Sequence, residues 1–469
     1  MENDTINEII AEKLKSKIRG VVVMKTDSTY HEDRKLYNRM IQKYPTAIVK
    51  CANVADVLQT VSFCRKNGLV TAIRGGGHNG AGLGSCNDGI VIDLSLMKGI
   101  HIDPDKKTAR VEAGCLLGDV DQATSVFGLA VPSGIFSTTG LGGLTLGGGL
   151  GYLTRKYGLT IDSLLEADIV LADGRSVTVN EDEHPDLFWA IRGGGGNFGV
   201  VTSFLFKLHP VSEVYAGPIF WEANKAKEVM QFYRDYMKTA SNDMYGFFTL
   251  MIIPASEPFP KQLWNKNVCA IVWNYMGEIE KANEIFSPIR EFATPVLDFA
   301  GPIPFKNLQS MFDAVYPHGL HWYWKADYLN ELSDEAIEEN IKFGTTIPTP
   351  LSQTHIYPID GLAGSIPKDA TAWNYRDAKY AQAIVAVDTG DDKMEKAIDW
   401  CKSFWEAVHP HSAGGAYSNF MMEEGQERVK AAYGDNYKRL AEVKLKYDPD
   451  NFFRVNHYIE PARKKARAV

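Results

Sequence analysis

Three consecutive glycines between an arginine and a histidine are the residues of this chain best suited to binding an anion. The segment reads Arg74-Gly75-Gly76-Gly77-His78-Asn79-Gly80. Residues without a Cβ atom let backbone N–H groups approach an anion closely, and the adjacent arginine suits a nucleotide pyrophosphate. The sequence therefore predicts a nucleotide-binding loop, in which the role of His78 needs a separate explanation.

Two glycine patterns match the dinucleotide fingerprint but lack its structural context. They are Gly75-x-Gly77-x-x-Gly80 and Gly194-x-Gly196-x-x-Gly199. A Rossmann fold requires a helix that begins at the last glycine, because the pyrophosphate binds at the N-terminus of that helix. Strands are predicted instead, at residues 90–94 and 200–206. These loops therefore belong to a different fold.

Short strands and helices alternate in the part of the chain that must position these loops. The glycine run follows a predicted strand at 69–73, which is preceded by a helix at 54–67 with Asn53 as its N-cap. Further strands are predicted at 47–51, 109–113, 129–132, 167–172 and 200–208, and a second helix at 117–127. A second glycine-rich stretch covers residues 134–151.

The character of the sequence changes after Pro210. The region from about 212 to 410 is rich in aromatic residues, and its strands, such as 268–275 and 383–388, predict an antiparallel sheet. Helices predicted at 223–238, 279–292, 333–342 and 392–407 would cover one face of this sheet, and another helix is predicted at 437–447. These changes divide the chain into domains at 1–210, 211–410 and 411–469.

The composition of the 469 residues is that of a globular protein, with 45% hydrophobic and 23% charged residues. A net charge of −8 argues against a nucleic-acid partner. The sequence has no apolar run long enough to span a membrane and no signal-peptide core. Its six cysteines are scattered without metal-ligand spacing, so we expect them to be reduced and mostly buried, and the protein to be cytoplasmic.

Four motifs give the chain a resemblance to a known family. The chain resembles the berberine-bridge-enzyme-like branch of the FAD-linked oxidases in the vanillyl-alcohol-oxidase superfamily, from about residue 40 to 461. The motifs are Arg74-Gly-Gly-Gly-His78-Asn79, Gly142-Gly143-x-x-x-Gly147-Gly148-Gly149-x-Gly151-x-x-x-Arg155-Lys156-Tyr157-Gly158-Leu159, Arg192-Gly-Gly-Gly-Gly196-Asn197-Phe198-Gly199-Val200-Val201-Thr202, and Lys446-Tyr447-Asp448-Pro449-x-Asn451-x-Phe453-x-x-Asn456.

The resemblance implies an α+β fold and a covalent cofactor. The FAD-binding domain would have two subdomains, completed by the C-terminal segment, and the middle domain would lay its antiparallel sheet over the flavin. His78 matches the residue that bonds to the flavin 8α-methyl group. The other cofactor-binding residues that the resemblance implies are Arg74, Gly75, Gly76, Gly77, Asn79, Thr139, Gly140, Gly143, Gly148, Gly149, Val201 and Asn456.

A second flavin bond, formed by a cysteine in many members of the family, is not expected here. The matching position is Phe136, which cannot form a thioether. Cys115 is the nearest upstream cysteine, but it lies in a different motif and is better interpreted as a small buried residue. We therefore expect a single covalent link, at His78.

Tyr417 matches the family tyrosine that faces the flavin, and it is the candidate general base for an alcohol substrate. Because a free tyrosine has a pKa near ~10, it would need a cationic neighbour, for which Lys325 is a candidate. The alternatives are that Tyr417 is a wall of the pocket and Lys325 a solvated strand residue. His355 and Tyr357 alternate on a predicted strand and, with Trp324, could face the substrate or pack under a helix.

The position that controls access of oxygen in this family is occupied by Thr139, followed by Gly140, which favours an open oxygen pocket. The predicted function is therefore an FAD-dependent oxidase of a small alcohol, sugar or amine that produces hydrogen peroxide. The alternatives are a dehydrogenase of the same fold and a non-catalytic flavin-binding protein. The pairs His318/His321 and His409/His411 lack further ligands at suitable spacing, so no metal site is predicted.

Overall fold

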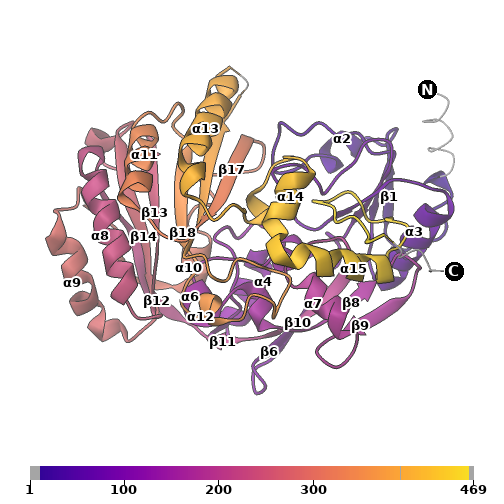
Figure 1. Ribbon diagram of the computed structural model, residues 1–469. Coiled ribbons are helices and arrows are strands. Elements are labelled where there is room, and N and C mark those ends of the chain that lie inside the picture. The colour runs from indigo at the N-terminus through magenta and orange to yellow at the C-terminus, as the bar shows by residue number, and fades with distance from the viewer. Residues whose placement is uncertain (1–10, 391, 464–469) are drawn as a thin grey trace.

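The computed structural model of the protein describes residues 11–390 and 392–463, and its N-terminal part forms two small subdomains (Figure 1). The first is a four-stranded sheet in the order β1-β2-β4-β3, covered by helix α3 (Val54–Lys66). Strands β2, β4 and β3 are parallel. The strands are β1 (Val21–Met24), β2 (Ala47–Lys50), β3 (Thr71–Arg74) and β4 (Ile90–Asp93).

Helix α3 shows how local sequence sets an element of this subdomain. The Asn53 side chain accepts a hydrogen bond from the backbone N–H of Asp56, which caps the helix as predicted. Val57, Val61 and Cys64 are fully buried on one face of the helix. Gly68 follows the helix with a φ of +63°, a left-handed conformation that glycine adopts without the steric strain that a Cβ atom would cause.

The second subdomain is a five-stranded antiparallel sheet in the order β5-β6-β10-β8-β9. Its strands are β5 (Ile100–Asp103), β6 (Thr108–Glu112), β8 (Leu164–Val170), β9 (Ser176–Val179) and β10 (Val200–Lys207). The helices of this part are α4 (Leu117–Ser125), α5 (Leu141–Leu146), α6 (Thr154–Tyr157) and α7 (Pro185–Ile191). Helix α5 lies within the glycine-rich stretch, for which the sequence predicts no helix.

The middle region is an antiparallel sheet in the order β15-β12-β14-β13-β18-β19-β17, with β16 paired to β12. Its main strands are β12 (Glu213–Glu222), β13 (Met244–Ile252), β14 (Asn267–Tyr275), β17 (His321–Leu329), β18 (Gln353–Pro358) and β19 (Tyr380–Asp388). Helices α8 (Ala226–Thr239), α9 (Ala282–Phe292), α11 (Asp334–Gly344) and α13 (Met394–Val408) cover one face (Figure 1). The opposite face is rich in buried aromatic residues and faces the N-terminal subdomains.

The C-terminal segment returns to the N-terminal part of the molecule (Figure 1). Helices α14 (Gln426–Tyr433) and α15 (Tyr437–Tyr447) lie there, and α15 packs against α7. Lys444 and Asp448 form a fully buried ion pair with an Nζ–Oδ2 distance of 2.6 Å. The Lys444 ammonium also donates to the carbonyl oxygens of Asn197 (2.6 Å) and Phe453 (2.9 Å), so it ties this segment to the loop before β10.

The predicted α+β class is confirmed, as is the antiparallel sheet with four covering helices. The domain boundaries at 210 and 410 stay predictions. No helix within the described ranges combines the length and apolarity needed to cross a membrane. All six cysteines are buried and free of disulfide bonds.

Candidate active site

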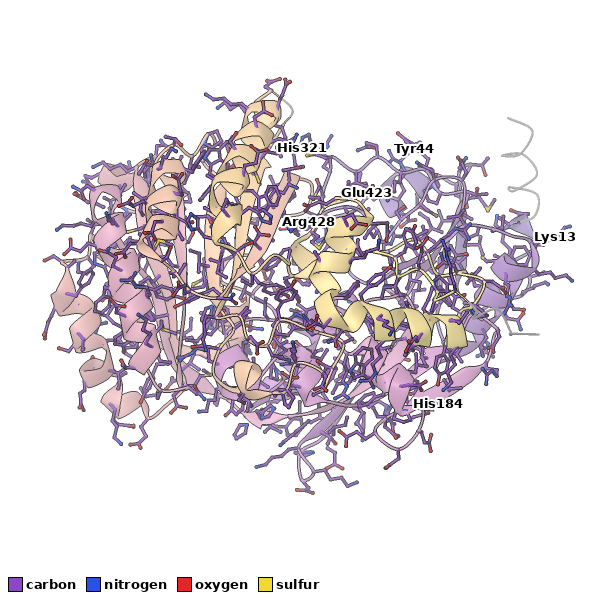
Figure 2. All side chains as sticks on the ribbon, viewed as in Figure 1. Lys13, Tyr44, His184, His321, Glu423 and Arg428 are labelled. Carbon is purple, nitrogen blue, oxygen red and sulfur yellow. The ribbon has the colours of Figure 1, made fainter. Side chains whose placement is uncertain are left out.

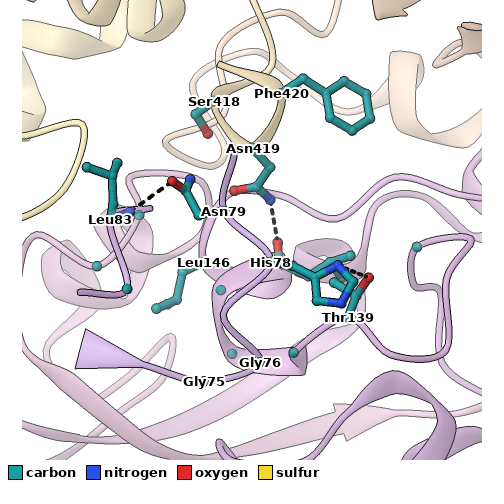
Figure 3. Close-up of a pocket in the computed structure, with 18 of the residues that line it drawn as sticks. Gly75, Gly76, His78, Asn79, Leu83, Thr139, Leu146, Ser418, Asn419 and Phe420 are labelled. Atoms are coloured by element: carbon teal, nitrogen blue, oxygen red, sulfur yellow. Dashed lines mark hydrogen bonds between the residues drawn. The ribbon is translucent and has the colours of Figure 1, made fainter. Parts of the chain in front are cut away.

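The glycine-rich loops and the aromatic face of the large sheet enclose one cavity. Its wall combines residues 73–79 at the end of β3 and in the loop after it, and residues 134–150 around α5. It also includes residues 195–201 in the loop before β10 and at the start of that strand, strands β17 to β19, and residues of the C-terminal segment. Figure 3 shows Ser418, Asn419 and Phe420 on one side of this cavity and Gly75, Gly76 and His78 on the other. The four motifs of the sequence therefore converge on the same space.

The glycines of these loops have two different roles. A Cβ atom on Gly76 would lie 2.3 Å from the backbone nitrogen of Gly140, and one on Gly140 would lie 2.2 Å from the nitrogen of Gly76. These two glycines therefore let the two loops touch. A Cβ on Gly143, in contrast, would meet no atom within 4 Å, so this residue leaves open space in the cavity wall. Gly75 and Gly77 also line the cavity.

Arg74 lies at the glycine-rich end of the cavity, but its charge is already paired. Its Nε donates to Asp93 at 2.8 Å, and Nη2 contacts the same carboxylate, with both side chains buried. Its Nη1 is buried and has no partner among the described residues. Arg74 can therefore offer one N–H group to a ligand, but its positive charge is largely offset by Asp93.

His78 is enclosed by aromatic groups and kept neutral. Its ring stacks on Tyr37 with a centroid distance of 3.9 Å and an interplanar angle of 16°. Burial lowers the pKa of His78 to about 3, with the nearby His318 adding to the effect. Nδ1 lies 3.5 Å from the Thr139 hydroxyl (Figure 3), and Nε2 has no hydrogen-bond partner within the described part of the chain. An unprotonated ring with a free nitrogen is the form in which histidine can act as a nucleophile.

Gly148 and Gly149 are not among the residues that line the cavity, and their expected role as cofactor contacts stays a prediction. Gly149 instead donates its backbone N–H to the Tyr417 hydroxyl, at 2.9 Å. Its φ is +79°, and a Cβ there would lie 2.0 Å from the Thr160 hydroxyl oxygen. These glycines therefore shape the turn that supports Tyr417.

The remaining predicted cofactor residues lie where the C-terminal segment meets the cavity. The side-chain nitrogen of Asn456 donates to the carbonyl oxygen of Gly196 at 2.8 Å, and Val201 also faces the cavity. The Asn79 side chain accepts from the N–H of Leu83 at 3.1 Å and fixes the loop after His78 (Figure 3).

Tyr417 has its hydroxyl held by two donors. The oxygen accepts from Gly149 N at 2.9 Å and from Asn419 Nδ2 at 2.8 Å. Burial raises the pKa of Tyr417 to about 12, although the two hydrogen bonds act in the opposite direction. The side chain is therefore a neutral phenol at pH 7. With both lone pairs of its oxygen occupied, Tyr417 can donate a hydrogen bond but has little capacity to accept one.

Lys325 is not the cationic neighbour of Tyr417, which corrects the prediction. Trp324 faces the cavity, so Lys325, the next residue on β17, points to the opposite face of the sheet. Its ammonium pairs with Glu424 at 2.5 Å and lies 4.5 Å from the centre of the Trp405 ring. Figure 2 shows Arg428, which donates to Ala326 and Asp327 of the same strand, where helix α14 meets β17.

His355 and Tyr357 both face the cavity from β18, as their alternation predicts. Their Nδ1 and hydroxyl oxygen are 2.5 Å apart. Burial lowers the pKa of His355 to about 3 and holds the pKa of Tyr357 well above its usual value. The pair is therefore neutral over the whole physiological range.

Sequence reasoning missed several residues of the cavity. Gln353 lies on the same face of β18 as His355, and the period of two along the strand could have identified it. Tyr37 lies far from every motif, and only its stacking on His78 reveals it. Asn419 and Phe420 follow Tyr417 in the same short segment. No group of three or more potential metal ligands occurs among the residues that the structure describes.

Comparisons with known proteins agree with these motifs. The family described as FAD binding domain matches residues 45–180, and the family described as berberine and berberine like matches residues 416–460. A FAD-linked oxidoreductase of Bacillus subtilis is 32% identical, with 96% of this chain and 99% of the relative covered. (R)-6-Hydroxynicotine oxidase of Paenarthrobacter nicotinovorans is 29% identical, with coverages of 95% and 97%.

Solved structures share the whole fold. The crystal structure of 6-hydroxy-D-nicotine oxidase from Arthrobacter nicotinovorans has a TM-score of 0.86 and 27% identity, and covers 95% of this chain and 98% of its own. A chitooligosaccharide oxidase has a TM-score of 0.85 at 22% identity, with coverages of 97% and 100%. At that identity the likeness shows the fold alone.

Proposed function

The chain belongs to the family of FAD-linked oxidoreductases with a berberine-like C-terminal segment, and we propose that it is an oxidase with FAD bound covalently at His78. It would oxidise a small alcohol, sugar or amine and pass the electrons to O₂. The observation that carries this proposal is the neutral His78 ring, whose buried Nε2 has no partner beside a glycine-lined cavity.

The residues of the cavity fit an FAD molecule. Two buried polar atoms, His78 Nε2 and Arg74 Nη1, have no partner in the described chain and would gain one from a ligand. Gly143 leaves open space, and Gly195 and Gly196 form the wall near Asn456. His78, Arg74, Gly75, Gly77 and Asn456 would hold the cofactor.

A single covalent link is supported by the surroundings of the second position. Phe136 lines the cavity at the place where many relatives have a cysteine. None of the six cysteines lines the cavity, and burial raises the pKa of the Cys115 thiol to about 12, so that it stays a thiol rather than a reactive thiolate.

When bound, FAD supplies hydride acceptance at its N5 atom. The residues of this chain must then orient the substrate and handle its proton. Tyr417 offers an O–H group to the substrate, and the neutral pair His355–Tyr357, with Trp324, forms the facing wall. Because no cation lowers the pKa of Tyr417, its phenolate could act as the base for an alcohol only at high pH. An amine that enters in its free-base form needs no such base.

Reaction with O₂ rather than another acceptor is supported by Thr139, a small residue that lines the cavity beside His78. A relative named above, (R)-6-hydroxynicotine oxidase, is by its name an oxidase of a small molecule. We also propose a cytoplasmic location, which is supported by six buried cysteines without disulfide bonds.

Two measurements test the proposal. The protein, run on a denaturing gel, should show flavin fluorescence that His78→Ala abolishes, whereas the control His318→Ala keeps it. His318 contacts the His78 ring edge-on at 5.4 Å and is therefore a matched neighbour. A panel of alcohols, sugars and amines should then include a compound that bleaches the oxidised flavin anaerobically. Fluorescence retained in His78→Ala would refute the covalent link, and fast reoxidation by quinones but not by air would indicate a dehydrogenase.

A further inference from the structure

The wall of the cavity formed by the large sheet carries no net charge. It contains Trp322 and Trp324 from β17, Gln353, His355 and Tyr357 from β18, and Ala383 and Val385 from β19. No Asp, Glu or Lys side chain of the described residues lines the cavity at all. The one arginine, Arg74, lies at the glycine-rich end and is paired with Asp93. A charged substrate would therefore find no counter-ion.

The titratable groups on this wall also stay neutral. The pKa of His355 is lowered to about 3 by burial, and the pKa values of Tyr357 and Tyr417 are raised by the same cause. Moving an ion from water into such surroundings is costly unless an opposite charge and hydrogen bonds compensate for it. Aromatic faces attract cations, but this attraction recovers only part of that cost.

Aromatic rings dominate the contacts around this wall. The ring of Tyr37 stacks on that of Trp322 with a centroid distance of 5.2 Å, and Trp322 contacts Trp324 edge-on at 5.7 Å. The ring of Phe420 contacts those of Tyr357 and Tyr417, with centroid distances of 5.6 and 4.9 Å. Such surfaces favour a planar ring, which gains stacking and edge-to-face contacts.

Polar groups on the wall are few. On the sheet itself they are Gln353, the pair His355–Tyr357, and the buried indole N–H groups of Trp322 and Trp324, which have no partner in the described part of the chain. The C-terminal segment adds the Tyr417 hydroxyl, whose oxygen is already occupied by two N–H donors. A sugar carries hydroxyl groups on every side, and most of them would lose their water partners here without replacement. A compound with one or two polar groups on a ring loses far less.

From these observations we infer that the substrate is an uncharged aromatic compound with one hydrogen-bond acceptor near the oxidised carbon, received by the Tyr417 hydroxyl. Gln353 is a specificity-determining residue, because it is a neutral polar side chain that faces the ring-lined space from β18. This inference rests on the proposed function, since it assumes that FAD occupies the glycine-rich end.

The test measures binding of probe compounds to the oxidised holoenzyme under anaerobic conditions. Binding is monitored as a change in the flavin absorbance. The probes have similar size and differ in charge: 4-methoxybenzyl alcohol, 4-(hydroxymethyl)benzoate and 4-(aminomethyl)benzyl alcohol, with cellobiose as a neutral sugar. We expect the neutral aromatic probe to bind at least ~10-fold more tightly than each of the other three, a difference that corresponds to about 1.4 kcal/mol.

Variants of Gln353 should cancel this preference. Gln353→Lys should strengthen binding of the benzoate by at least ~10-fold, and Gln353→Glu should do the same for the aminomethyl compound, because each supplies the missing counter-ion. Gln262→Lys is the matched control, since Gln262 is exposed and outside the cavity. A circular dichroism spectrum and a thermal unfolding midpoint close to those of wild type show that each variant is folded.

The inference is overturned if a charged probe or cellobiose binds wild type as tightly as the neutral aromatic probe, if no probe binds, or if Gln353→Lys leaves the preference unchanged. Loss of the proposed function looks different: the protein would then carry no covalent flavin in the denaturing gel.

Discussion

At the scale of the residue, the hydroxyl of Tyr417 determines how this site can handle protons. The sequence identified the tyrosine but assigned it the wrong neighbour, because Lys325 follows Trp324 and the period of two along a strand places consecutive residues on opposite faces. The actual neighbours, Gly149 and Asn419, are uncharged donors. They polarise the hydroxyl without making it a base at neutral pH.

Tyr417→Phe separates alcohol from amine chemistry. With an alcohol substrate at high pH, where the Tyr417 phenolate can form, we expect the rate of flavin reduction to fall by ~10²-fold, the usual scale for loss of an acid–base group. The wild-type rate should rise with pH and reach no plateau below pH 10, because the pKa of this phenol is about 12. With an amine, the variant should keep the wild-type pH profile. Stopped-flow absorbance measures the rate of flavin reduction with each substrate. If the variant oxidised an alcohol as fast as wild type at every pH, Tyr417 would have no role in the mechanism.

Thr139 is expected to govern the reaction with oxygen. It lines the cavity beside His78, so Thr139→Leu should fill space there and slow reoxidation in air by at least ~10-fold, with a much smaller effect on reduction by substrate. Thr139→Val, which keeps the shape and removes the hydroxyl, is the matched control and should retain fast reoxidation. Equal slowing of both half-reactions in Thr139→Leu would assign the residue to the substrate pocket.

At the scale of the element, amphipathic helices were predictable and glycine-rich turns were not. The predicted helix at 392–407 corresponds to α13 (Met394–Val408), because its apolar residues repeat with the period of a helix. Helix α5 (Leu141–Leu146) was missed because glycine disfavours helices in isolation; tertiary contacts such as the close approach of Gly140 to Gly76 hold this segment.

The buried ion pair at the end of α15 should contribute strongly to stability. Lys444→Met leaves Asp448 buried without its partner, so we expect the free energy of unfolding to fall by about 3–5 kcal/mol. Lys446→Met removes an ion pair with Asp186 in which the lysine side chain is 60% exposed, and should cost less than ~1 kcal/mol. Urea unfolding followed by tryptophan fluorescence measures both. Similar losses in the two variants would show that the buried pair has no special role.

At the scale of the whole molecule, the cavity draws on segments from residue 37 to residue 457. Local patterns could predict the separate strands and helices, but only the resemblance of the four motifs to a family indicated that they meet. Tyr37 shows the limit of prediction from local sequence, since no residue next to it in the chain indicates its contact with His78. Asn38, beside it, bonds to both Gly80 and Trp322, and thereby joins the cofactor loop to the large sheet.

Neutral buried histidines should make the fold sensitive to acid. The pKa of His355 is about 3 in the folded state and 6.5 as the reference value, so the unfolded state binds more protons between these pH values and stability falls as the pH drops. We expect a loss of about 2 kcal/mol between pH 7 and pH 5 from this residue. Burial raises the pKa of Asp121 to about 7, so this residue has the opposite effect on stability as the pH falls. It is present in both wild type and the His355→Phe variant described next, so its effect cancels in their comparison.

His355→Phe isolates this contribution. The variant stays uncharged at every pH, so its unfolding free energy should change less between pH 7 and pH 5 than that of wild type, by that same ~2 kcal/mol. Urea titrations at the two pH values give the comparison. An unchanged pH dependence would mean that His355 is protonated in the folded state.

The contribution of Asn456, His457 and Tyr417 to the cavity has a consequence for biosynthesis. A ribosome makes the Arg74–His78 loop well before these residues, while N-terminal domains begin to fold during translation. A nascent chain therefore carries an open half-site, and capture of the vitamin-derived cofactor must wait until the segment with Tyr417, Asn456 and His457 has emerged and docked. Premature termination after the large sheet would yield a colourless polypeptide, which quality-control proteases could distinguish from the finished yellow enzyme.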